Sequence, residues 1–262
     1  MLLIDKYAYF NRLKNTHPIE KMFFSIYLLL FTLVVRDSLV SLVTFMVMSA
    51  FIVLGAKIPF SYYIRLLLLP SLFLLSGIIV ILISITDAQT NIVHSICSLH
   101  IWQWQIYISK EGMYSAVNLI FVVMGSVSCL YFLILTTPFI EILQVLQKLR
   151  VPMLLIELIS LTYRFIFVFL EVAIEIYQAQ SSRLGYITIR QGIQSLGQLV
   201  SMLFVKMLQR THQLFIAMNA RGYEEELLLV EQSYNYSKIN WVIIIGIAVG
   251  ITVVYAKFGG SL

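Results

Sequence analysis

The chain has 262 residues, of which 60% are hydrophobic and only 12% are charged. Soluble domains usually carry about 25% charged residues, so this composition excludes an ordinary soluble protein. The net charge of +5 fits the positively charged loops of a membrane protein, and we expect no nucleic-acid partner. Several uncharged apolar runs approach the ~20 residues that a membrane-spanning helix needs. The predicted class is an all-α polytopic membrane protein.

In chain order, the N-terminal segment is charged and polar and does not have the pattern of a signal peptide. Five apolar segments follow that predict membrane-spanning helices. A tight turn with Asp37 at its tip separates the first two, and Pro59 lies in the turn before the third. Residues 87–111 are expected to form a polar loop whose aromatic side chains favour the headgroup region. The five predicted spans are 19–35, 38–56, 66–86, 113–135 and 239–256.

The orientation follows from the distribution of lysine and arginine. With the N-terminus in the cytoplasm, fifteen of the 18 basic residues fall inside, and only Arg36, Lys110 and Lys257 remain outside. Positively charged loops favour the cytoplasmic side, although long loops carry less weight in this rule. We therefore expect a multi-pass protein of the cell inner (plasma) membrane with a cytoplasmic N-terminus.

The segment after residue 137 is apolar but repeatedly interrupted by charge. A charge at the bilayer centre costs about 2.5–3.5 kcal/mol on the insertion scale. The polar residues fall on one helical face, so we predict amphipathic helices at 138–149, 153–183 and 190–219, although a sixth span within 153–175 stays an alternative. Thr137 is the expected N-cap of the first, with Pro138 at its first position. The polar faces contain Glu157, Ser160, Arg164, Glu171, Gln178 and Ser182 in one long helix and Gln191, Gln194, Gln198, Gln209 and Gln213 in the other.

This pattern predicts three parts. Residues 1–137 form an N-terminal four-helix transmembrane part, residues 138–237 form cytoplasmic coupling helices, and residues 238–262 form a C-terminal transmembrane helix. About a hundred residues of amphipathic helix exceed what a simple permease needs, and they suggest a platform for other proteins.

The predicted spans lack the features of an autonomous pump. Their interiors contain no charged residue or histidine, whereas ion-coupled transporters place such groups on the substrate path. The chain has no phosphate-binding loop of an ATPase and no nucleophile or zinc motif of a hydrolase. We therefore expect no catalytic residue. The last span contains Gly246-x-x-x-Gly250, which suits either ordinary packing or a close helix partner.

Two arginines end the two long predicted helices in a similar way. Arg183 is followed by Gly185 and Tyr186, and Arg221 by Gly222 and Tyr223. Glycine often terminates a helix, and a cation there offsets the helix dipole by about 0.3–1 kcal/mol, which is the simplest role for either arginine alone. As a pair on a platform without an ATPase, they suggest two docking points, because a guanidinium pairs bidentately with carboxylates.

With these motifs the sequence resembles the T component of energy-coupling factor (ECF) transporters, an ABC importer class, and among them the cobalt-type CbiQ proteins. The resemblance covers essentially the whole chain. It rests on "IDKYAYFNRLKNTHPIEK" near the N-terminus, "LTTP" at 135–138, "SRLG" at 182–185 and "ARGY" at 220–223. The family's two X-Arg-X motifs correspond to Ser182-Arg183-Leu184 and Ala220-Arg221-Gly222. The second matches the usual Ala-Arg-Gly form, and the first departs from it at both flanks.

The resemblance implies a non-catalytic coupling subunit of an importer for cobalt or nickel. Its arginine tips would sit in grooves of two cytoplasmic ATPase subunits of the CbiO kind. They would pass ATP-driven closure to a separate, CbiM-like membrane subunit that binds the substrate. It implies no cofactor and no metal site in this chain, with ATP bound by the partner subunits. The same scaffold serving vitamin-binding subunits is an alternative.

Three weaker hypotheses remain. His94, Cys97 and His100 could ligate a transition metal in the loop at 87–111, although their spacing fits known metal motifs loosely. An intramembrane enzyme would use carboxylates at Glu224–Glu226 or at Glu171 and Glu175. An autonomous channel would transport without partners. His17 is expected to be structural, and His212 to be solvated or hydrogen-bonded.

Overall fold

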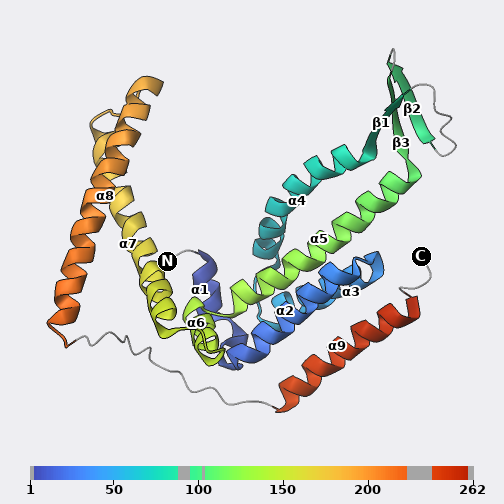
Figure 1. The fold of residues 1–262 in the computed structure, drawn as a ribbon, viewed down its shortest axis with the longest axis horizontal. Coiled ribbons are helices and arrows are strands. Elements are labelled where there is room, and N and C mark those ends of the chain that lie inside the picture. The colour runs from blue at the N-terminus through green and yellow to red at the C-terminus, as the bar shows by residue number, and fades with distance from the viewer. Residues whose placement is uncertain (1–2, 88–94, 102–103, 223–237, 259–262) are drawn as a thin grey trace. The chain divides into compact units, whose positions relative to one another are not determined.

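The computed structural model describes residues 3–87, 95–101, 104–222 and 238–258. The chain forms two compact units, one of Leu2–Phe139 together with Ser233–Leu262 and one of Ile140–Gln232. We call them the membrane unit and the hairpin unit. Figure 1 traces both in chain order.

The membrane unit contains a helix for each of the five predicted spans, but the bounds 66–86 predicted for the third were wrong at both ends, because α4 begins at Phe60 and ends at Leu82. The short α1 (Leu3–Phe10) and a 3₁₀ turn (Arg12–Asn15) precede them and were not predicted. The fifth span closes the chain after the hairpin unit. The long helices are α2 (Pro18–Val35), α3 (Ser38–Ala50, extended by a π-turn at Phe51–Gly55), α4 (Phe60–Leu82), α5 (Lys110–Thr136) and α9 (Lys238–Phe258).

Local sequence signals explain where these helices begin and end. Pro18 is the first residue of α2, and the Nδ1 atom of His17 caps that helix by accepting from the Ile19 backbone N–H at 3.1 Å. The structural role predicted for His17 is confirmed. Arg36 adopts a left-handed conformation with φ of 50°, and Asp37 then caps α3. The predicted tight turn is thus a helix stop followed directly by a helix start.

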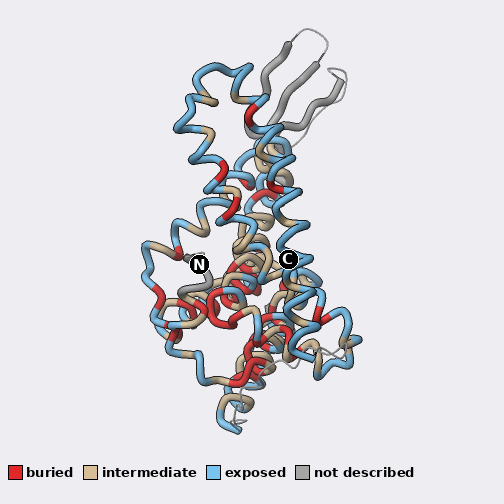
Figure 2. The backbone as a smooth tube through the Cα atoms, turned by 90° about the vertical axis from the view of Figure 1, so that its left-hand side faces the viewer, coloured by how far each residue is buried: buried red, intermediate tan, exposed pale blue. Residues whose placement is uncertain are grey.

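The core of the membrane unit lies between α5 and the helices α2 and α3. Phe24, Phe51 and Phe132 pack edge to face there, with ring centroids 5.3–6.3 Å apart. Gly125 lets α5 approach α3 closely, because a Cβ atom at this position would lie 2.9 Å from the Ser41 carbonyl oxygen. Figure 2 shows buried stretches alternating with exposed ones along the helices, as packing on one face requires.

Large apolar side chains also cover outward faces of this unit. Leu69, Phe73 and Val80 of α4 are all at least two-thirds exposed. An exposed apolar face of this extent fits contact with lipid tails rather than water. Among the described residues, six helices are long and apolar enough to cross a membrane: the five spans and Met153–Ser182. The chain is a multi-pass, all-α membrane protein apart from one small sheet.

The expected loop at 87–111 is in part a small antiparallel sheet. Strands β1 (Ile83–Asp87), β2 (Ser95–Ile101) and β3 (Trp104–Ser109) pair in the order β1-β3-β2. The prediction of a loop was therefore wrong for β2 and β3, and β1 takes the place of the last residues of the predicted span 66–86. Apolar and more polar residues alternate in these segments, as in Ile106, Tyr107 and Ile108. This alternation is typical of a β-strand and could have predicted the strands, whereas the overall polarity of the segment suggested a loop.

The hairpin unit consists of α6 (Phe139–Lys148), α7 (Met153–Ser182) and α8 (Ile189–Asn219), close to the predicted bounds. Figure 1 shows α7 and α8 meeting near their short turn and diverging toward their other ends. Val172, Ile176 and Leu203 form the buried seam between them. The expected cap of α6 was wrong: the Thr137 hydroxyl is buried, with no hydrogen-bond partner in the described part of the chain, and the helix begins at Phe139.

Candidate functional site

The first arginine tip lies at the end of α7. Arg183 is the C-cap residue, and Leu184 follows it in a left-handed conformation with φ of 62°. The Gly185 N–H donates to the Gln180 carbonyl at 3.0 Å and the Leu184 N–H to that of Ser181 at 2.9 Å. These two bonds make a Schellman termination, which satisfies the last carbonyls of the helix. The side chains of Arg183 and Leu184 are exposed.

A ring of hydrogen bonds fixes this tip to the start of α8. The Ser195 hydroxyl donates to the Gly185 carbonyl at 2.8 Å, and the Gln180 side-chain amide donates to the Ser195 carbonyl at 3.0 Å. The Tyr186 hydroxyl in turn donates to the Gln180 side-chain oxygen at 2.7 Å. Gly185 is required by space rather than by its φ angle, because a Cβ atom would lie 2.7 Å from the Ser195 Oγ. The exposed arginine is thus carried by a well-braced turn.

The second tip ends α8 with the same backbone pattern. Ala220 is its C-cap residue, Arg221 follows, and Gly222 adopts a left-handed conformation with φ of 73°. A Cβ atom at Gly222 would meet nothing within 4 Å, so here the φ angle alone favours glycine. All three residues are exposed. The left-handed residue therefore follows the arginine directly in both tips, as a leucine in one and a glycine in the other.

The two tips are separate positions on the hairpin unit. The 31 residues of α8 lie between them, which corresponds to about 45 Å at 1.5 Å per residue. Among the described residues, neither Arg183 nor Arg221 forms a hydrogen bond or ion pair through its side chain. The flanking Ser182 bonds its own helix, because its hydroxyl donates to the Gln178 carbonyl at 2.9 Å. Both arginine side chains are exposed, and the spacing exceeds what one small site could span.

A second group of residues, in the membrane unit, joins the N-terminal motif to "LTTP" at 135–138. Asn11 is 4% exposed, and its amide donates to the carbonyls of Leu135 and Thr136 at 3.3 Å each. The ammonium of Lys21, also 4% exposed, donates to the Thr136 carbonyl at 3.0 Å. These donors satisfy the C-terminal carbonyls of α5, and the cation lies where the helix dipole favours it. We call this group the α5 junction.

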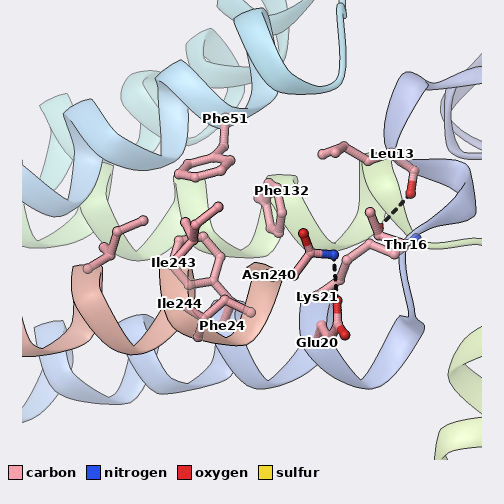
Figure 3. A pocket seen from close by; sticks show the side chains of 11 residues that line it. Leu13, Thr16, Glu20, Lys21, Phe24, Phe51, Phe132, Asn240, Ile243 and Ile244 are labelled. Carbon is pink, nitrogen blue, oxygen red and sulfur yellow. Dashed lines mark hydrogen bonds between the residues drawn. The ribbon is translucent and has the colours of Figure 1, made fainter. Parts of the chain in front are cut away.

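A pocket of about 100 Å³ opens beside the α5 junction and contacts α9 (Figure 3). The Asn240 amide at the start of α9 donates to the Glu20 carboxylate at 2.8 Å, and Glu20 is 2% exposed. Phe24, Phe132 and Ile244 line the apolar side of the pocket. The sequence did not lead us to predict buried charges at the start of α2. The pattern that could have indicated them is the adjacent pair Glu20 and Lys21 in the first turn of that helix.

Some of the other site residues proposed from the sequence lie in the described part of the structure, and some lie outside it. His94, Tyr223 and Glu224–Glu226 lie outside the described residues. Cys97 and His100 lie three residues apart on β2, and the metal hypothesis stays a prediction. Glu171, Glu175 and His212 are exposed on α7 and α8. A Cβ atom at Gly246 or Gly250 would meet no described atom within 4 Å, so packing among the described residues does not explain that motif.

Comparison with known proteins identifies the family. The family model of the CbiQ cobalt transport protein matches residues 10–230. The cobalt transport protein CbiQ of Rhodobacter capsulatus is 30% identical over 86% of this chain and 85% of its own length. That of Salmonella typhimurium is 30% identical over 63% of this chain and 72% of its own length.

A further relative is the putative fused cobalt transport protein CbiMQ of Methanocorpusculum labreanum. It is 34% identical over 71% of this chain, and this region spans 30% of the fused protein. With a family model that covers most of the sequence and both arginine tips, the chain belongs to the CbiQ cobalt transport protein family.

Proposed function

We propose that this chain is the transmembrane coupling (T) subunit of an ECF-type ABC importer for cobalt or nickel. The observation that carries the proposal is the pair of exposed arginines, each placed directly before a left-handed residue at the end of a long helix. Two tips of like geometry about 45 Å apart suit two similar partner subunits better than one. Membership of the CbiQ family supports cobalt as the cargo and a transporter component rather than an enzyme.

In this mechanism each guanidinium enters an acidic or carbonyl-lined groove of a cytoplasmic ATPase subunit. Arginine suits this task because its charge persists on desolvation and its planar fork donates two parallel hydrogen bonds. ATP-driven closure would move the tips, and the braced turn at Gly185 and Ser195 would pass that motion into α7 and α8. The chain itself binds no nucleotide in this scheme, and the N-terminus lies in the cytoplasm.

The substrate would be bound by a separate membrane subunit. The fused relative, whose name combines CbiM with CbiQ, supports a CbiM-like protein as that subunit. Identifying the membrane protein that co-purifies with this chain distinguishes the cobalt or nickel importer from the vitamin alternative, since the two would recruit different substrate-binding subunits.

The decisive experiment replaces Arg183 and Arg221 together by alanine. We expect loss of ATPase co-purification and of ATP-driven cobalt uptake in proteoliposomes. A matched control, Arg190→Ala with Lys206→Ala, removes the same charge from exposed positions on α8. Uptake and ATPase capture that match the control variant would disprove the docking role. Uptake by the purified chain alone, without ATP, would instead favour an autonomous channel.

A further inference from the structure

The seam between α7 and α8 ends at a charged groove. Along the seam, apolar residues recur every four positions, at 168, 172 and 176 on α7 and at 199, 203 and 207 on α8. Four residues before Val168, the repeat meets Arg164 instead of an apolar side chain. On α8, Arg210 follows Met207 by three residues. The two helices diverge in this direction (Figure 1), and a cavity of about 380 Å³ lies between them.

This groove brings two cations together without a compensating partner. Arg164 and Arg210 both line it, and neither side chain forms a hydrogen bond or ion pair with another residue in the described part of the chain. Glu171 also lines the groove, and it too forms no ion pair with any described residue. Two arginines and one glutamate leave a net positive charge. Like charges at one site repel, so an anion bound between them would be favourable.

The walls of the groove are apolar as well as charged. Phe165, Val168 and Leu214 line it beside the two arginines. A small hydrated anion would gain nothing from these side chains, whereas an amphiphile would bury its hydrocarbon against them. The helix that supplies Arg164, Phe165 and Val168 is itself apolar and long enough to cross a membrane. A lipid is therefore the ligand that can contact both the arginines and the apolar side chains of the groove.

We propose that this groove binds the phosphate headgroup of an anionic phospholipid. Arg164 and Arg210 hold the phosphate from the two helices, because guanidinium groups form bidentate, charge-assisted hydrogen bonds with phosphate oxygens. The acyl chains lie on Phe165, Val168 and Leu214. Glu171 opposes the anion and limits its affinity. Bound in this way, the lipid bridges α7 and α8 beyond the point where their apolar seam ends.

Native mass spectrometry of the full chain, titrated with dioleoylphosphatidylglycerol, tests this proposal. Arg164→Gln with Arg210→Gln should weaken the tightest lipid binding by about tenfold or more. The control, Arg190→Gln with Lys206→Gln, removes equal charge from α8 outside the groove and should leave that affinity unchanged. Glu171→Gln should tighten binding several-fold, a gain that a misfolded protein would not produce.

Other outcomes would overturn the assignment. Equal binding of dioleoylglycerol, which lacks the phosphate, would mean that the apolar wall alone recruits lipid. If inorganic phosphate alone binds the groove as tightly as the lipid, the ligand is a free anion. A groove variant that binds phosphatidylglycerol like the control but loses a co-purifying protein would assign the groove to an acidic protein segment.

Discussion

Replacing Gly185 by alanine tests whether the first arginine tip must be rigid. The added Cβ atom would lie 2.7 Å from the Ser195 Oγ and 3.0 Å from the Gln180 carbonyl oxygen. The hydroxyl can rotate away, but it then gives up its 2.8 Å hydrogen bond to the Gly185 carbonyl. The carbonyl of Gln180 belongs to the Schellman termination and moves only if that termination opens.

The expected cost follows from these two contacts. Overpacking of a well-packed site costs about 1–3 kcal/mol, and the lost hydrogen bond about 1 kcal/mol more. Local opening of the turn should therefore become favourable by about 2–4 kcal/mol, which corresponds to a 30- to 1,000-fold faster amide exchange in peptides that cover the turn. Hydrogen–deuterium exchange of the full chain in detergent measures this directly.

Gly197→Ala, on α8 just after the turn, is the matched control. A Cβ atom at Gly197 would meet nothing within 4 Å, so alanine there should slow exchange slightly through its better helix propensity, worth about 1 kcal/mol. If Gly185→Ala exchanges like the wild type or like Gly197→Ala, the turn is not braced as the structure indicates. Normal ATPase capture by a Gly185→Ala variant whose turn has opened would show that docking does not require a rigid turn.

Three further outcomes are expected, each read as the change in unfolding free energy or melting temperature of the purified chain. Leu184→Gly should stabilise the α7–α8 turn by about 1 kcal/mol, because glycine adopts the left-handed conformation without the steric cost that leucine bears; destabilisation would show that the leucine side chain has a packing role. Gly125→Ala should destabilise the membrane unit by about 1–3 kcal/mol, because its Cβ atom would meet the Ser41 backbone. The control Gly77→Ala should be neutral or stabilising, because a Cβ atom there meets nothing within 4 Å. Equal effects of the two substitutions would refute the close approach of α5 to α3. Asn11→Ala should cost about 1–3 kcal/mol, since the buried Leu135 carbonyl at the end of α5 loses this donor and the Thr136 carbonyl keeps only that of Lys21. An unchanged melting temperature would mean that another group satisfies the Leu135 carbonyl.

Most helix boundaries followed from the sequence because they depend on neighbouring residues. An apolar run of bilayer length must satisfy its backbone internally, so it forms a helix whatever surrounds it. His17 with Pro18 and Asp37 mark starts that the structure confirms. The same reasoning placed both long helices of the hairpin unit within one residue of their observed starts and ends.

Other features needed contacts between distant residues. The apolar alternation of β3 and its partners became strands only where three short segments could pair. Thr137 looked like a cap from its position before Pro138, yet the helix starts beyond it and its hydroxyl bonds to no other residue that the structure describes. Short polar signals near a helix start are ambiguous because the tertiary packing of the segment selects which residue takes the cap conformation.

The sequence by itself determined the class of protein, the number of its long helices, the bounds of most of them and the two arginines that end α7 and α8, because hydrophobicity and helix termination are local properties. The tertiary structure alone decided that Asn11 meets the end of α5, 124 residues away, and that Asn240 meets Glu20. It also decided that Leu184 takes the left-handed position and that Arg164 and Arg210 share one groove. These contacts depend on which helix faces approach each other. The periodicity of a sequence shows that a helix has an apolar face, but it does not show which element that face packs against.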